Sequence, residues 1–388
     1  MLLEWLAALA LAAWLGVLLL PSRSWSTRER LALASGQDVP GNLQDLSAIS
    51  VLIPARNEAG QIGSTLRALA RQGVNLEAIV VDDQSTDGTG GAARGAVPGN
   101  DEFLTTRIVP GAPLPEGWGG KLWALEQGRG QLKRKYCLLL DAEIELAPGV
   151  AASLLYKAES ESLAMVSIMA ELRCVSFWER LLVPPFIFFF KLIYPFSKVN
   201  EPRFKTAAAA GGCILIRTNV LNEIGGFAAI RTALIDDCTL AARVKSAGLA
   251  IWIGLSHAVT SQRSYPTLES FRRMVRRTAF TQLRYSYLLL TLVIALLLLV
   301  FVVPWLALLA GPDAPARAIG AAALLSMTTA YLPTVRFYRL PAICALSLPL
   351  AALFFLSMTI ESAWRYLRGV RAEWKGRTYE TTGGNKPR

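Results

Sequence analysis

The apolar residues of this chain are unevenly distributed. Residues 2–20 and most of 286–363 are nearly free of charge, whereas 21–285 mix apolar and polar positions as a globular domain does. A helix of about 20 apolar residues crosses a bilayer, and no small-residue cleavage pattern precedes Pro21, as a removed signal peptide would require. The pattern therefore predicts a membrane anchor at 1–21 and transmembrane helices within 286–363.

Within 22–265, short apolar runs alternate with helical patterns. Four of the runs are typical of buried strands: 49–53, 76–81, 104–109 and 136–140. Helical patterns follow at 61–71 and after Lys121. Strands that alternate with helices form right-handed βαβ units, and these build a parallel, doubly wound sheet. We therefore expect an α/β fold with a mostly parallel sheet.

Polar clusters follow three of these strands: Arg56-Asn57-Glu58, Asp82-Asp83 and Asp141-Ala142-Glu143. In parallel sheets, ligands bind beyond the carboxyl ends of the strands. Helix capping explains single acids such as Asp87, with Ser85 beside it, but not paired acids after two separate strands. The Asp-x-Glu spacing places two carboxylates on one side of an extended segment, and such ligands suit Mg²⁺ or Mn²⁺ held together with substrate phosphates.

Charge and rare residues narrow the class of protein. The net charge is +11, and the basic residues cluster beside apolar segments, at 21–30 and 271–284, which suits the cytoplasmic face of a membrane. There is no nucleic-acid fold motif, so we expect no nucleic-acid partner. The five cysteines have no metal spacing, which predicts reduced packing residues. His257 is the only histidine and is expected to be structural.

The motifs occur in an order that resembles family 2 glycosyltransferases, which have the GT-A fold. They are Pro54-Ala55-Arg56-Asn57-Glu58, Val81 to Asp87, Gly120-Lys121, Asp141-Ala142-Glu143, and Ile235-Asp236-Asp237. The resemblance covers about 50–255, so 22–265 is expected to be a GT-A catalytic domain. The loop Gly117 to Lys121, the Asp236-Asp237 pair and the terminal Trp374-Lys375-Gly376-Arg377 further resemble the hopene-associated glycosyltransferases of bacteria.

The resemblance implies a role for each residue. The donor-binding residues would be Pro54, Arg56, Glu58, Asp83, Lys121, Asp141 and Arg284. Asp141 and Glu143 would hold the Mg²⁺ or Mn²⁺, with Glu143 standing where the family usually has aspartate. Asp237 would be the catalytic base, with Asp236 in the place of the family's glutamate. Arg284 lies in Gln282-Leu283-Arg284-Tyr285, one of two stretches that come near the family's diphosphate-binding Gln/Arg-x-x-Arg-Trp element; the other is Arg273 to Arg277.

Two further motifs have alternative interpretations. Asp236 and Asp237 open a helical pattern that reaches Ala247, so they can also be helix caps. Gly211-Gly212 either lets the backbone approach the sugar or forms a tight turn.

The remaining segments point to the membrane. Residues 266–285 form a basic amphipathic pattern, expected to be an interfacial helix. The apolar stretch 176–196 is interrupted by Pro184-Pro185 and Lys191, which indicates an interfacial element on the acceptor side. Three spans are expected at 286–310, 316–335 and 340–363. The basic tail 364–388 is expected in the cytoplasm, and with four spans in all this requires one segment to be re-entrant.

Together these features predict a membrane-bound inverting glycosyltransferase of the bacterial inner membrane. It would be multi-pass, with a cytoplasmic catalytic domain, and would move a sugar from a nucleotide-diphosphate donor, UDP by preference, to a lipid such as a hopanoid. The alternatives are a polyprenyl-phosphate glycosyltransferase and a non-catalytic nucleotide-sugar-binding subunit.

Overall fold

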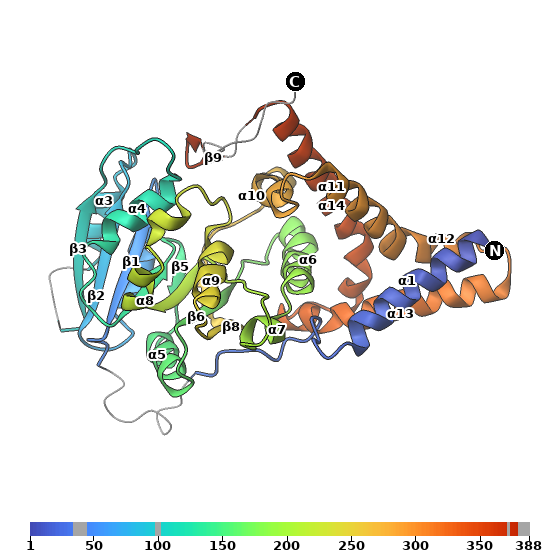
Figure 1. Cartoon of the computed structure of the whole chain (residues 1–388), viewed down its shortest axis with the longest axis horizontal. Helices are drawn as coiled ribbons and strands as arrows, with labels where there is room; N and C mark the ends of the chain where they lie inside the picture. The colour runs from blue at the N-terminus through green and yellow to red at the C-terminus, as the bar shows by residue number, and fades with distance from the viewer. Residues whose placement is uncertain (34–44, 98–101, 371–372, 379–388) are drawn as a thin grey trace. The chain divides into compact units, whose positions relative to one another are not determined.

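The computed structural model describes residues 1–33, 45–97, 102–370 and 373–378 (Figure 1). The chain divides into two compact units that interleave along the sequence. The helical unit comprises 1–28, 174–197 and 264–370. The sheet unit comprises 29–173, 198–263 and 371–388. Of the expected basic tail, 371–372 and 379–388 lie outside the described residues.

The sheet unit is built on an eight-stranded sheet with the order β3-β2-β1-β4-β7-β6-β8-β5. The strands are β1 Ile49–Ala55, β2 Leu76–Asp82, β3 Leu104–Pro110, β4 Tyr136–Leu140, β5 Ile144–Leu146, β6 Met165–Glu171, β7 Cys213–Arg217 and β8 Ile251–Ser261. β1 to β4 pair in parallel, and so do β6 and β8, whereas β7 runs antiparallel to β4 and β6. The mostly parallel α/β sheet is therefore confirmed, with β7 and the short β5 as its antiparallel strands.

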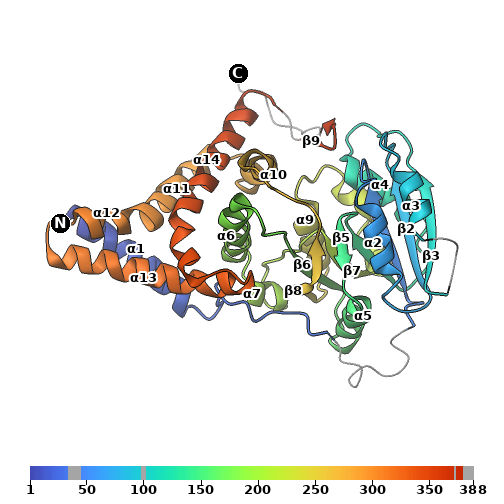
Figure 2. The same cartoon turned by 180° about the vertical axis from the view of Figure 1, so that it is seen from behind.

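The four strands predicted from apolar runs all form, but the first is longer than expected. β1 continues through Pro54 to Ala55, so Pro54 lies inside the strand rather than at its end. Every residue of β1 is buried, as in a strand that is covered on both faces. Figure 2 shows α2 (Ile62–Leu69) and α3 (Thr89–Ala96) in front of the sheet, and Figure 1 shows α4 (Gly120–Arg129) on the opposite face.

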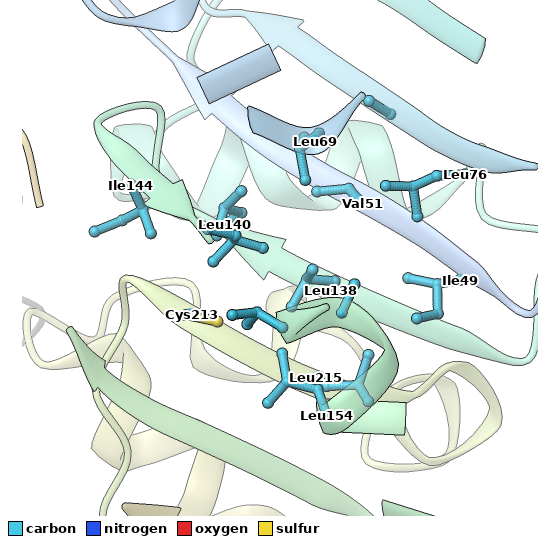
Figure 3. Packing of buried hydrophobic residues seen from close by; sticks show 14 of the residues in the cluster. Ile49, Val51, Leu69, Leu76, Leu138, Leu140, Ile144, Leu154, Cys213 and Leu215 are labelled. Carbon is cyan, nitrogen blue, oxygen red and sulfur yellow. The ribbon is translucent and has the colours of Figure 1, made fainter. Parts of the chain in front are cut away.

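The main core of the sheet unit lies between the strands and the helices that cover them. Alternate residues of β1, such as Val51 and Ile53, join one core cluster with Leu66 of α2. Leu154 of α5 (Val150–Ser160) packs in the same cluster beside Leu215 of β7 (Figure 3). The remaining helices of this unit are α8 Thr218–Glu223, the 3-10 turn Phe227–Ile230 and α9 Asp236–Ser246; α7 Phe196–Asn200 spans the boundary.

The helical unit contains four helices that are long and apolar enough to cross a membrane: Leu2–Leu19, Tyr287–Ala310, Ala314–Phe337 and Ala342–Leu367. These are α1, then α11 and α12 joined by the π-helical turn Leu298–Val302, then α13, and finally α14 (Leu348–Leu367) with the 3-10 turn before it. They coincide with the four predicted apolar segments. Trp14 of α1 fixes one contact among them, because its indole nitrogen donates to the Val300 carbonyl at 2.9 Å.

The two remaining helices of this unit are α6 (Phe177–Ile193) and α10 (Leu268–Gln282). α6 begins with a capping box in which Ser176 and Glu179 bond each other's backbone, and it continues through both prolines. α10 packs on α14, where Arg276 lies 3.1 Å from the Glu361 carboxylate. Their expected interfacial roles stay predictions.

Gly128 allows α4 to lie close against the sheet. A Cβ at this position would lie 2.2 Å from Leu52 Cδ1 and 2.9 Å from Val81 Cγ2. We expect Gly128→Ala to destabilise the protein by about 1–3 kcal/mol, because overpacking a filled core forces the neighbours apart. The measurement is thermal unfolding of the purified protein in detergent. Gly130→Ala is the control, since its Cβ would meet nothing closer than 3.5 Å; equal midpoints for the two variants would contradict this packing.

Candidate functional site

Hydrogen bonds join the loops that follow β1 and β2. The backbone amide of Asn57 donates to Ser85 Oγ at 3.0 Å, and the Asn57 side-chain oxygen accepts from the Thr86 amide at 2.9 Å. These bonds fix Glu58 and Asp83 on neighbouring loops at the carboxyl edge of the sheet. Asp83 is fully buried there and Glu58 nearly so.

The expected caps of this region behave differently from each other. Asp87 serves the start of α3, since its carboxylate accepts from the Thr89 amide at 3.0 Å. Its second oxygen accepts from the Ala59 amide at 3.0 Å. Ser85 is not a helix cap, because its hydroxyl is used by Asn57.

Basic side chains balance the charge of these two acids. The Arg56 guanidinium lies 3.9 Å from Asp83 Oδ2 and donates to the Asp83 carbonyl. Arg377 Nη2 lies 2.8 Å from Asp83 Oδ1, and Lys375 Nζ lies 2.7 Å from Glu58 Oε1. Burial raises the pKa of Asp83 above its usual range, although the charges of Arg377 and Arg56 oppose the shift.

Arg263 is a further basic residue of the site, and the sequence analysis missed it. Its Nε lies 3.1 Å from Glu143 Oε1, and its Nη2 lies 3.5 Å from Glu58 Oε1. Arg263 follows β8 by two residues and belongs to no motif. The register of β5 and β8, in which Ile144 is opposite Ser261, brings it beside Glu143.

A pocket lies beside these loops, with Lys121 on its wall. Gly119 precedes α4 as its N-cap, which places Lys121 in the first turn of the helix. Lys121 Nζ lies 2.7 Å from Asp141 Oδ1 and 3.8 Å from Asp236 Oδ2. Burial lowers the pKa of Lys121, but the charges of Asp141 and Asp236 outweigh it, and the net shift is upward.

Several predicted site residues come together around this pocket. Its lining is formed by Pro54, Lys121, Leu122, Leu125, Leu139, Leu140, Asp141, Gly211, Ile214, Phe227, Ile230, Asp236, Asp237 and Leu240. Most of the lining is apolar, and Lys121, Asp141, Asp236 and Asp237 are its charged members. The pocket lies at the carboxyl edge of the sheet, which is where ligands bind in folds of this kind.

Asp237 is held by two backbone amides. Its Oδ2 accepts from the Gly211 amide at 2.8 Å, and its Oδ1 accepts from the Cys238 amide at 2.7 Å. Burial, together with the charge of Asp236, raises the pKa of Asp237 to about 6. A carboxylate with a raised pKa in a pocket is a candidate proton acceptor.

The start of α9 and the backbone at Gly211 both contact Asp237. α9 begins at Asp236, and its N-cap residue Ile235 makes no side-chain cap hydrogen bond. Asp237 nevertheless accepts from the first-turn amide of Cys238, so it serves the start of the helix and also lines the pocket. Gly211 lies close to Asp237, because a Cβ on this glycine would lie 3.2 Å from Asp237 Oδ2. The glycine thus permits the amide of its own backbone to reach the carboxylate.

The Asp-x-Glu spacing predicted an extended segment, but Asp141 to Glu143 form a turn, closed by a hydrogen bond from the Ile144 amide to the Asp141 carbonyl. The two carboxylates are therefore placed differently in the site. The Asp141 side chain is 27 % exposed and faces the pocket, whereas Glu143 is buried beside Arg263. Burial and then the charge of Asp141 raise the pKa of Glu143. Over the described ranges, no three His, Cys, Asp or Glu side chains form a complete metal site. Mg²⁺ bound to substrate phosphates needs only one or two carboxylates, so the residues fit a metal shared with a substrate.

Two further residues singled out in the sequence have other surroundings. Arg284 belongs to the helical unit, where it follows α10 with a left-handed φ of 52°; its donor-binding role stays a prediction. His257 lies within β8 rather than after it, and its Nδ1 is 2.8 Å from Glu171 Oε2. That pairing agrees with the structural role expected for it.

Part of the chain matches a known family of proteins. Residues 50–225 match the model of Glycosyl transferase family 2. The chain is 34 % identical over 99 residues to a 4,4'-diaponeurosporenoate glycosyltransferase of Staphylococcus haemolyticus (strain JCSC1435). That alignment covers 26 % of this chain and only 25 % of the relative's length.

A solved structure resembles almost the whole chain. It is the mannosyltransferase PcManGT from Pyrobaculum calidifontis in complex with GDP-Man and Mn²⁺, with a TM-score of 0.54 and 19 % identity. The likeness covers 93 % of this chain and 99 % of that one, and at this identity it establishes the fold alone. Residues 50–225 thus match a glycosyl transferase family 2 domain, which supports the glycosyltransferase class, and the likeness to the solved structure supports a GT-A-type fold.

The raised pKa of Asp237 predicts a pH-dependent effect on stability. Between its usual pKa near 4 and about 6, the folded protein binds a proton more tightly than the unfolded chain. The contribution of Asp237 to stability is therefore lost as pH rises through this window. We expect the unfolding temperature of Asp237→Asn, relative to that of the natural protein, to rise between pH 4.5 and pH 7.5. A difference that stays constant or falls would contradict the burial of this carboxylate.

Proposed function

We propose that this chain is a membrane-bound, metal-dependent, inverting glycosyltransferase that moves a sugar from a nucleoside-diphosphate donor, UDP by preference, to a lipid. The observation that carries the proposal is the Asp237 carboxylate, which lies in a pocket with Lys121 and Asp141 and has a pKa of about 6. Such a group is deprotonated at neutral pH and still basic enough to accept a proton.

The donor would bind along the carboxyl edge of the sheet. Glu58 and Asp83 face the nucleoside, with Arg56 and Pro54 beside them, and Lys121 meets the diphosphate. Asp141 and Glu143 would hold Mg²⁺ or Mn²⁺ together with the phosphates, where the cation neutralises charge on the leaving nucleotide. The similar Pyrobaculum enzyme was solved with GDP-Man and Mn²⁺, which supports a nucleotide sugar and a divalent cation.

The chemical step follows from the placement of Asp237. Its carboxylate removes the proton of the acceptor hydroxyl as that oxygen forms a bond to the anomeric carbon. The bond from this carbon to the diphosphate oxygen breaks, and the electron pair leaves with the nucleotide. Attack from the face opposite the leaving group inverts the configuration. The charge of Asp236, which raises the pKa of Asp237, strengthens the base.

The acceptor is proposed to be a membrane lipid, a hopanoid by the resemblance of the motifs. Among the residues that the structure describes, four helices are long and apolar enough to hold the chain in a bilayer. The Staphylococcus relative is named a 4,4'-diaponeurosporenoate glycosyltransferase, which supports a lipid acceptor for this chain. The proposed location is the bacterial inner membrane, with the sheet unit in the cytoplasm.

Asp237→Asn tests the catalytic base. With purified protein in bacterial lipid extract and Mn²⁺ or Mg²⁺, we expect this variant to release nucleotide from the preferred donor about 10²–10⁴-fold more slowly while donor affinity is kept. Asp313→Asn, at the N-cap of α13, is the matched control and should retain full activity. A milder loss would favour a polyprenyl-phosphate acceptor, which is already anionic. If the natural protein and both variants bind the donor but none of them releases nucleotide, the chain would be a non-catalytic binding subunit.

The pH dependence of turnover tests the same carboxylate independently. Because the carboxylate must be deprotonated to act, kcat/KM of the natural protein is expected to fall about tenfold per pH unit below about pH 6, the pKa given by burial and Asp236. The measurement is nucleotide release at subsaturating donor from pH 5 to pH 8. A flat profile over this range would exclude Asp237 as the group that limits the reaction.

A further inference from the structure

The end of the described chain forms a small hairpin on the sheet unit. Its strands are β9 (Glu373–Trp374) and β10 (Arg377–Thr378), and Lys375 and Gly376 make the turn. Residues 373–378 are called the tail hairpin here. The hairpin follows the last apolar helix in the chain and belongs to the same compact unit as the sheet.

The tail hairpin bonds to three of the predicted donor-binding residues. Arg377 lies 2.8 Å from Asp83, and its Nη2 also donates to Gln84 Oε1 at 3.0 Å. Lys375 lies 2.7 Å from Glu58, and its carbonyl accepts from Arg56 Nε at 3.0 Å. These contacts join segments that are far apart in the chain: Arg377 and Asp83 are separated by 294 positions.

Two polar atoms at this contact are buried without a hydrogen-bond partner. They are Asp83 Oδ2, on a residue with no exposed surface, and Arg377 Nε. A buried donor or acceptor that is left unsatisfied destabilises the protein. Asp83 and Arg377 form one ion pair, and each keeps one atom without a hydrogen bond: an acceptor on Asp83 and a donor on Arg377. This arrangement is expected where a bound ligand supplies the missing partners.

We propose that the tail hairpin is a wall of the nucleobase subsite and that Arg377 determines base specificity together with Asp83. This inference rests on the proposed function. Asp83 Oδ2 accepts a hydrogen bond and Arg377 Nε donates one. The matching ligand edge has an N–H next to a C=O, as in uracil and guanine. Cytosine and adenine present an unprotonated ring nitrogen next to an amino group. In the same orientation of the nucleoside, this reversed order places an acceptor against Asp83 Oδ2 and a donor against Arg377 Nε.

The hairpin must move for this binding to occur. Asp83 Oδ2 and Arg377 Nε are shielded from solvent, so a base reaches them only when the hairpin lifts. The ion pair of Lys375, a side chain that is 26 % exposed, and the hydrogen bond from Arg56 hold it closed. The carboxylates of the Lys375–Glu58 and Arg377–Asp83 ion pairs are both buried, so opening costs free energy, which the bound nucleotide has to offset. The hairpin then closes over the bound base.

The experiment measures the affinities of UDP, CDP, GDP and ADP for the purified full-length protein by calorimetry. The natural protein should bind UDP more tightly than CDP, or GDP more tightly than ADP, by about tenfold or more, because mispaired buried groups reject the wrong ligand. Arg377→Gln should weaken the preferred nucleotide by about 10–100-fold and leave the disfavoured one unchanged. Arg203→Gln, whose side chain is 74 % exposed in the same unit, is the control.

The variant Arg377→Lys separates recognition of the nucleobase from neutralisation of the Asp83 charge. Lysine keeps the charge beside Asp83 but has no second nitrogen in the guanidinium geometry, so base preference should fall even though the variant folds. Unchanged or tighter UDP and GDP binding by Arg377→Gln would overturn the inference and indicate a hairpin that blocks the site. If the natural protein binds none of the four nucleotides, the proposed function itself fails, and the inference fails with it.

Discussion

The site depends on balancing the charges of carboxylates that are gathered at one edge of a sheet. Parallel strands deliver Glu58, Asp83, Asp141 and Glu143 to this edge, and α9 adds Asp236 and Asp237. Partly desolvated like charges raise one another's pKa values and oppose folding. Basic residues from distant parts of the chain offset this repulsion: Arg56, Lys121, Arg263, Lys375 and Arg377.

The same balance suggests how the site would accept a donor. A nucleoside diphosphate brings negative charge, which Lys121 can meet if it exchanges its bond to Asp141 for one to phosphate. The freed carboxylate would then face a divalent cation that arrives with the donor. In this view the ion pairs of the resting protein hold the acids in place until substrate groups replace the basic partners. Asp237 differs from the others in its contacts, since backbone amides rather than a basic side chain hold it. Burial and the charge of Asp236 raise its pKa to about 6.

Much of the fold could be predicted because its signals are local. Buried strands such as β1 and the apolar helices are recognisable from hydropathy and length alone, and the acids that follow β1, β2 and β4 mark the functional edge. Boundaries were less certain: β1 includes Pro54, and Ser85 bonds to Asn57 instead of capping a helix. The partners of the acids were beyond prediction, because Arg263 is placed by the β5–β8 register and Arg377 by its contact with Asp83, 294 positions earlier in the chain.

The most direct test of the account is the stereochemistry of the transferred sugar. The natural protein would be incubated in bacterial lipid extract with an isotope-labelled, α-linked nucleoside-diphosphate sugar, and the lipid product analysed by NMR at the anomeric carbon. Single displacement with Asp237 as the base predicts a β-linked glycolipid. An α-linked product would require two successive displacements or another mechanism, and would contradict the role assigned to Asp237.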